Sequence, residues 1–188
     1  MNPAEVPLDA PAKASRRASS LVIVNTGDGK GKSTAAFGTA LRAVARGWKV
    51  CVIQFIKSDR WKVGERDAAQ RLGVDWWAIG DGFTWDSRSI ERTEAVAREA
   101  WRVAREKILS GAYGLVVLDE ITYPINWGWI PVAEVVSLIG SRPPSVNVIA
   151  TGRDAPAELI DVADTVTEMR NRKHAFDRGI KAMRGIDF

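Results

Sequence analysis

Residues 25–34 (NTGDGKGKST) combine glycines, lysines and hydroxyls between an apolar run and a helical pattern. Glycines let backbone N–H groups turn around an anion, a lysine adds a point charge, and a hydroxyl can ligate Mg²⁺. The pattern is typical of a P-loop that binds a polyphosphate. Three residues separate Gly27 from Gly31, where the usual spacing has four. The residues that we expect to hold the phosphates are Gly27, Asp28, Gly29, Lys30, Gly31, Lys32, Ser33 and Thr34.

Two further groups follow apolar runs that have the composition of buried strands. Asp119 and Glu120 come directly after residues 115–118 (LVVL). In P-loop proteins an acid at this place organises Mg²⁺, so Asp119 is the expected metal-side carboxylate. Glu120 is either a second Mg²⁺ contact or, in an ATPase, a base for water. Arg153 follows the apolar run 146–150, where a planar guanidinium can meet phosphate oxygens.

Residues 80–85 (GDGFTW) follow another probable strand and contain two large aromatic side chains in a glycine-rich loop. Water alone is a poor environment for Phe83 and Trp85. The composition leaves two interpretations open: the rings pack into the core, or they contact a flat, partly apolar ligand.

Acid–base groups are few. His174 is the single histidine, and the single cysteine, Cys51, lies in the apolar run 50–55, where a buried small side chain is expected. This inventory favours chemistry in which positioning and charge neutralisation do most of the work.

Composition sets broad limits on the protein. The 188 residues suit a single domain, and the net charge of +4 is mild and dispersed, which suits an anionic ligand but gives no reason to expect nucleic acid. One cysteine excludes an internal disulfide framework and fits a reducing compartment, so we expect a cytoplasmic protein. The sequence predicts no membrane span. Residues 1–20, rich in proline and alanine, predict a flexible arm ahead of a domain over residues 21–188.

Apolar runs alternate with amphipathic stretches along that domain. Strands are predicted at 21–24, 50–55, 74–79, 115–118, 146–150 and 165–169, and helices at 33–46, 89–110, 131–139 and 156–163. In the first helix Phe37, Ala40, Leu41 and Val44 form the expected apolar face. Strands separated by helices imply right-handed crossovers. The expected fold is α/β, P-loop NTPase-like (RecA-like), with a mostly parallel sheet and helices on both faces.

Eight ordered segments together resemble the ATP:corrinoid adenosyltransferases of the cobalamin pathway, the CobA/CobO/BtuR type. The segments are 25–40, 54–57 (QFIK), 64–66 (GER), 82–85 (GFTW), 116–120 (VVLDE), 151–153 (TGR), 173–177 (KHAFD) and 185–187 (GID). The match extends in order from about residue 21 to the C-terminus.

The resemblance implies that Co(I) of a reduced corrinoid attacks C5′ of ATP and that triphosphate leaves. Lys32, the loop amides and Mg²⁺, with Lys30 and Arg153, would stabilise the leaving group, and Ser33 and Thr34 would offer hydroxyls to phosphate or Mg²⁺. ATP would bind in the reverse of the usual direction, and Arg42 would be a further nucleotide contact.

On the corrinoid side, the resemblance makes Phe83 and Trp85 the aromatics that keep the lower axial ligand off cobalt, which eases reduction of Co(II). It also implies a homodimer and a flavin-dependent reductase as partner.

Two other functions compete with this one. A P-loop kinase or ATPase would cleave at the γ-phosphate and yield ADP, but it explains neither the short loop nor residues 82–85. A nucleotide-gated module for single-stranded nucleic acid would use the tryptophans and the positive charge, which is too weak and dispersed to favour it.

Overall fold

The computed structural model describes residues 17–56, 64–80 and 90–187. Its strands are β1 (Val22–Thr26), β2 (Val50–Gln54), β3 (Asp75–Ala78), β4 (Leu115–Asp119), β5 (Asn147–Thr151) and β6 (Thr165–Glu168). Its helices are α1 (Lys32–Ala45), α2 (Gly64–Arg71), α3 (Ile90–Leu109), α4 (Thr122–Asn126), α5 (Val132–Gly140), α6 (Ala157–Asp161) and the short 3₁₀ helix η2 (Phe176–Arg178).

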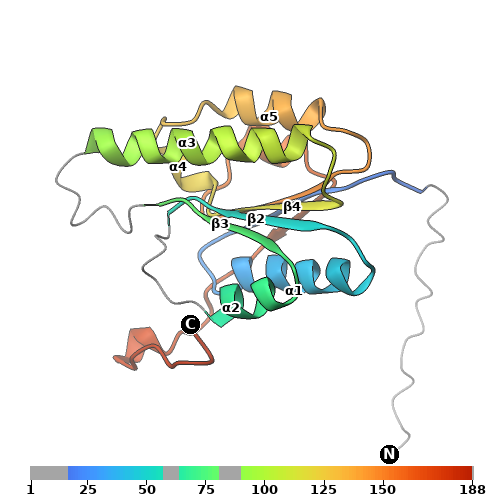
Figure 1. Cartoon of the computed structure of the whole chain (residues 1–188). Coiled ribbons are helices and arrows are strands. Elements are labelled where there is room, and N and C mark those ends of the chain that lie inside the picture. The colour runs from blue at the N-terminus through green and yellow to red at the C-terminus, as the bar shows by residue number, and fades with distance from the viewer. Residues whose placement is uncertain (1–16, 57–63, 81–89, 188) are drawn as a thin grey trace, which may run out of the picture.

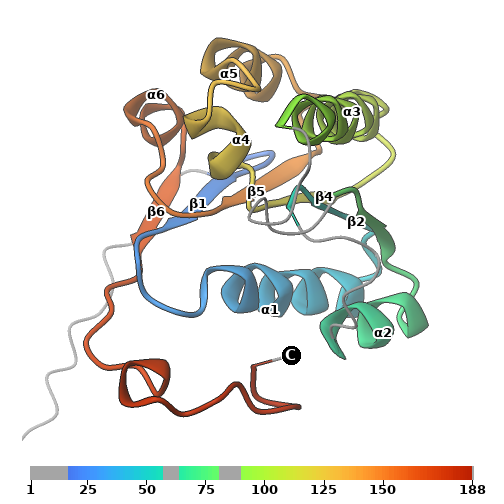
Figure 2. The same ribbon diagram turned by 90° about the vertical axis from the view of Figure 1, so that its left-hand side faces the viewer.

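The six strands form one sheet in the order β3-β2-β4-β5-β1-β6, and every pairing is parallel. Helices α1 and α2 cover one face, and α3, α4, α5 and α6 cover the other (Figures 1 and 2). The expected P-loop NTPase-like α/β fold is confirmed. Because all strands run in one direction, their carboxyl ends meet at one edge, which is where open α/β sheets bind ligands.

The core lies on both faces of the sheet. Strands β2 and β4 are buried along their whole length, as expected for strands covered on two sides. Cys51 is buried there, which confirms the prediction that it is a packed side chain.

Helix α1 meets the sheet through a face that overlaps the predicted one at Ala40 but excludes Leu41. Its buried residues are Ala36, Ala40 and Ala43, whereas Leu41 is 50% exposed. Small alanines let the helix axis approach β1, β4 and β5 closely, so the larger Phe37 and Val44 pack at the margin of the contact.

Two α-helices, and the 3₁₀ helix η2, were not predicted. Helix α2 has a single buried residue, Ala69, among polar neighbours, so it has little apolar periodicity. Helix α4 is only five residues long and contains Pro124.

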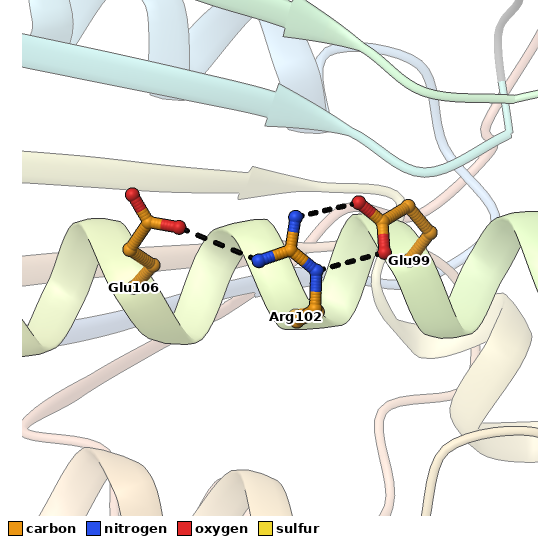
Figure 3. A network of polar contacts seen from close by, with 3 residues as sticks. All are labelled: Glu99, Arg102 and Glu106. Atoms are coloured by element: carbon orange, nitrogen blue, oxygen red, sulfur yellow. Dashed lines mark hydrogen bonds and ion pairs between the residues drawn. The ribbon is translucent and has the colours of Figure 1, made fainter.

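Helix α3 buries a stripe that includes Ala100, Trp101, Ala104 and Ile108. Its outer face is a solvated ladder of ion pairs (Figure 3). Arg102 bonds both carboxylate oxygens of Glu99, at 2.7 and 2.8 Å, and lies 3.5 Å from Glu106. This guanidinium is already paired, so the outer face of α3 offers no free anion site at Arg102.

Candidate functional site

The glycine-rich loop joins β1 to α1 at the carboxyl edge of the sheet. Gly27 and Gly31 have φ of +93° and +115°, in the region that favours glycine, and Gly31 caps the N-terminus of α1. Helix α1 therefore aims its unpaired N–H groups at the loop, which makes an anion site.

The outer side of this loop is packed against the chain that follows β6. The Gly29 N–H donates to the Met169 carbonyl at 2.6 Å, and the Met169 N–H donates to the Thr26 carbonyl at 2.8 Å. A Cβ on Gly27 would lie 2.5 Å from the Met169 carbonyl oxygen, and one on Gly29 would lie 2.7 Å from the Met169 carbonyl carbon. Glycine is thus required at both positions by close backbone packing. The Gly29 N–H is engaged outside the loop and does not face an anion.

Lys32 is the first residue of α1, and its ammonium bends back into the loop. Nζ donates to the carbonyls of Gly27 and Gly29, each at 2.7 Å. Burial, followed by the positive charge of Arg153, lowers the pKa of Lys32. Carboxylates of Asp28, Glu120 and Asp154 oppose that shift. The charged groups that act on the Lys32 ammonium therefore come from three separate segments: the glycine loop, the residue after β4 and the turn after β5.

Asp119 ends β4 and is fully buried, with 0% of its surface exposed. Its Oδ1 accepts a hydrogen bond from the Thr151 hydroxyl at 2.7 Å, and its Oδ2 accepts one from the Gln54 amide at 2.9 Å. Both donors are neutral, and a buried carboxylate is costly without a cation. Each oxygen keeps a lone pair for a water of hydrated Mg²⁺, so the donor set fits a metal held through water.

Strained backbone occurs in the turns that follow β4 and β5. Among the described residues, the non-glycine residues with positive φ are Glu120 (+64°) and Asp154 (+50°), and both act on the pKa of Lys32. Such conformations cost about 1–3 kcal/mol each and cluster at functional sites.

Arg153 follows β5 in a turn fixed by its neighbours. The Asn126 amide donates to the Asp154 carbonyl at 3.0 Å, and the Ala155 N–H donates to the Thr26 hydroxyl at 3.1 Å. The adjoining Gly152 has φ +143°, and a Cβ there would lie 1.9 Å from the Thr122 hydroxyl. The turn therefore places Arg153 at the same edge as the P-loop.

The remaining predicted residues lie in different places. Ser33 and Thr34 occupy the first turn of α1. Lys30 pairs with Asp187 at 3.2 Å, so the C-terminal segment reaches the loop. Arg42 is ten residues beyond Lys32, roughly 15 Å along the helix axis, and bonds Thr39 of its own helix at 3.2 Å. Phe83 and Trp85 lie outside the described residues.

Three residues that contact the site were not predicted as site residues from the sequence. Gln54 was quoted only as part of a family motif, although a polar residue that closes a buried strand at the ligand edge is a usable signal. Asp187 was likewise quoted only within the family segment 185–187, and Met169 was not singled out. Both act on the loop from more than 130 residues away, and no local pattern links either residue to it.

The described part of the chain lacks both a clustered metal site and a membrane-spanning helix. Residues 17–56, 64–80 and 90–187 contain no group of three or more His, Cys, Asp or Glu side chains arranged to hold a metal ion. No helix in these ranges has the length and apolar character needed to cross a bilayer.

Comparison with known proteins gives consistent results. Residues 18–188 match the family profile described as ATP:corrinoid adenosyltransferase BtuR/CobO/CobP. The chain is 46% identical to a corrinoid adenosyltransferase of Escherichia coli K12 over 168 residues, which cover 89% of this chain and 85% of the relative. It is 42% identical to corrinoid adenosyltransferase CobA of Salmonella typhimurium over 181 residues, which cover 96% and 92%.

Among solved structures, a DNA replication initiation factor aligns with 80% of this chain and 40% of its own, with a TM-score of 0.41 and 14% identity. That similarity is too low to bear on function. The chain belongs to the ATP:corrinoid adenosyltransferase BtuR/CobO/CobP family.

Proposed function

We propose that this protein transfers the 5′-deoxyadenosyl group of ATP to the cobalt of a reduced corrinoid. Co(I) donates an electron pair to C5′, the Co–C bond forms, and the pair of the broken C5′–O bond leaves with triphosphate. The observation that carries the proposal is the cradle of Gly27, Gly31 and Lys32 at the carboxyl edge of the sheet, in a chain of this family.

The proposed reaction suits the chemistry of the cradle. Co(I) is a strong nucleophile and needs no general base, so the protein's main tasks are alignment and stabilisation of the leaving triphosphate. In this structure the Lys32 ammonium is held by two loop carbonyls, contacts that phosphate oxygens can replace when they enter. We propose that Lys30 and Arg153 add positive charge, with Arg42 farther along the nucleotide.

We propose that Asp119 and Glu120, with Ser33, hold Mg²⁺ that accompanies ATP. The metal would supply neutralisation of the triphosphate charge. What supports this is the buried Asp119 carboxylate, whose two described partners are both neutral.

The reaction is tested by product identity. Incubation with Mg-ATP and a chemically reduced corrinoid should give triphosphate and a light-sensitive Co–C bond. Release of ADP in the absence of corrinoid would instead support a kinase or ATPase.

We propose from the family resemblance that Phe83 and Trp85 displace the lower axial ligand of the corrinoid. Phe83→Ala and Trp85→Ala should then slow the reaction that starts from Co(II) and a flavin reductant more than the reaction that starts from preformed Co(I). Equal losses in both assays would contradict this role.

We also propose a homodimer, a flavin-dependent reductase as electron source, and a cytoplasmic location suited to the single cysteine. Support for association comes from the C-terminal segment, where Phe176 and Ile186 are 75% and 71% exposed. Light scattering of the purified protein should give twice the mass of the 20.6 kDa chain.

A further inference from the structure

A chain of buried polar side chains crosses the sheet beside the proposed metal site. Gln54 ends β2, is 2% exposed, and lies directly opposite Asp119 in the register of β2 and β4. Its Nε2 donates to Asp119 Oδ2 at 2.9 Å, and its Oε1 accepts from the Trp76 indole N–H at 3.1 Å. Trp76 belongs to β3 and is 8% exposed.

The direction of these bonds follows from the chemistry of the groups. An indole nitrogen can only donate, so the Gln54 oxygen must face Trp76 and the Gln54 NH₂ must face Asp119. On the other side, the Glu120 N–H donates to the Thr151 hydroxyl at 2.9 Å, which directs the Thr151 proton to Asp119 Oδ1. Both oxygens of Asp119 are therefore held as acceptors.

This arrangement fixes the carboxylate plane. One oxygen is held from β2 and the other from β5, the two strands on either side of β4. Rotation of the carboxylate about its Cβ–Cγ bond would break a buried hydrogen bond on at least one side, which is costly. The lone pairs that remain on Asp119 consequently point in fixed directions.

We infer that Gln54 is a positioning residue that orients Asp119 toward the hydrated Mg²⁺ of Mg-ATP, and that Trp76 sets the orientation of the Gln54 amide. The inference rests on the proposed function, in which Asp119 serves the metal. Partners that orient a metal-side carboxylate typically contribute 10- to 100-fold to metal affinity.

The test is the Mg²⁺ dependence of ATP binding, measured by calorimetry without corrinoid. Gln54→Met keeps the volume and removes the amide, and it should raise the half-saturating Mg²⁺ concentration about tenfold. ATP affinity without metal should stay unchanged. Trp76→Phe keeps a ring and Gln54 but frees the amide to flip, and it should raise the Mg²⁺ requirement by a smaller factor.

Two control variants remove the same chemistry elsewhere. Trp101→Phe deletes an indole N–H that donates to Glu134 at 3.2 Å on the helical layer. Asn147→Leu deletes an amide that donates to the Gly114 carbonyl at 2.8 Å at the opposite edge of the sheet. Both controls should keep the wild-type Mg²⁺ requirement.

Three results would overturn the inference. Gln54→Met with a wild-type Mg²⁺ requirement would show that the amide does not position Asp119. Equal losses of ATP affinity with and without Mg²⁺ would indicate a purely structural role. If ATP binding to the wild type ignores Mg²⁺, the metal role of Asp119 fails as well, whereas a missing corrinoid product with normal Mg²⁺-dependent binding contradicts only the proposed transfer.

The single variant leaves the Trp76 N–H buried without a partner. If Gln54→Met is too unstable to purify, the double variant Gln54→Met/Trp76→Phe removes that donor and takes its place. It should show the same increase in Mg²⁺ requirement.

Discussion

Replacing Gly29 by alanine tests whether the P-loop depends on the chain that follows β6. Gly29 has an ordinary φ, so the substitution introduces no left-handed backbone strain, and its effect comes from contact alone. The added Cβ would lie 2.7 Å from the Met169 carbonyl carbon and 2.8 Å from the Arg170 carbonyl carbon. Both are backbone atoms, which cannot rotate away as the end of a side chain can.

The free-energy cost of Gly29→Ala has two parts. Separating the two segments loses the 2.6 Å bond from the Gly29 N–H to the Met169 carbonyl, a net loss of about 1 kcal/mol. Forcing a methyl group into packed structure costs about 1–3 kcal/mol. If the phosphates must restore the displaced loop when they bind, the two effects total about 2–4 kcal/mol, which weakens ATP binding at least about 30-fold.

The assay is calorimetric titration with Mg-ATP together with thermal unfolding. Gly38→Ala is the matched control, because a Cβ at Gly38 meets nothing within 4 Å on helix α1. This control should keep ATP affinity and gain about 0.5–1 kcal/mol of stability. If Gly29→Ala binds ATP and melts as the wild type does, the packing of the loop on Met169 does not constrain the site and the reasoning is refuted.

Three further predictions concern single side chains. Lys32→Ala should weaken Mg-ATP binding at least about tenfold, because it removes the ammonium held by two loop carbonyls. Lys49→Ala, at the other edge of the sheet, should leave Mg-ATP binding unchanged. Equal titration curves for Lys32→Ala and wild type would show that Lys32 does not belong to the site. Burial raises the pKa of the Cys51 thiol to about 12, so a thiol reagent at pH 8 should modify Cys51 only after unfolding in urea, and rapid labelling of the native protein would contradict its burial. The Tyr113 hydroxyl donates to Asp75 at 2.5 Å, and burial together with this bond raises the pKa of Tyr113 to about 12. The neutral Tyr113 hydroxyl therefore stabilises the fold below a pH of about 10, and this contribution is lost as the pH rises toward 12. Thermal unfolding between pH 9 and 12 should therefore show a smaller loss of stability in Tyr113→Phe than in the wild type, and parallel curves would argue against the coupling.

Much of the architecture could be predicted because its signals are local. Continuous apolar runs marked β2, β4 and β5, since strands covered on both faces need no polar alternation. The P-loop was visible because its glycines, lysine and hydroxyls are adjacent in sequence. Alternation of strands and helices then gave the parallel sheet and the edge at which Asp119 and Arg153 lie.

The parts that could not be predicted depend on tertiary packing. The buried face of α1 is set by how closely alanines allow the helix to approach the sheet, which periodicity alone misjudged at Leu41. The partners of the loop, Met169 and Asp187, come from the far end of the chain and carry no motif that points to residues 27–30. The position of Gln54 at the end of a buried strand is visible in the sequence, but its hydrogen bond to Asp119 depends on β2 lying beside β4.

The position of β1 within the sheet has a consequence for synthesis of the protein. Strand β1 is made first, yet its two neighbours are β5 and β6, the last strands to leave the ribosome. The glycine loop then needs the backbone of Met169 against its outer side. A nascent chain therefore carries every P-loop residue from its first 34 positions but has no assembled nucleotide site until about residue 170 has emerged. A chain that ends before that point contains every residue of the glycine-rich motif but cannot assemble the phosphate-binding loop that the motif predicts.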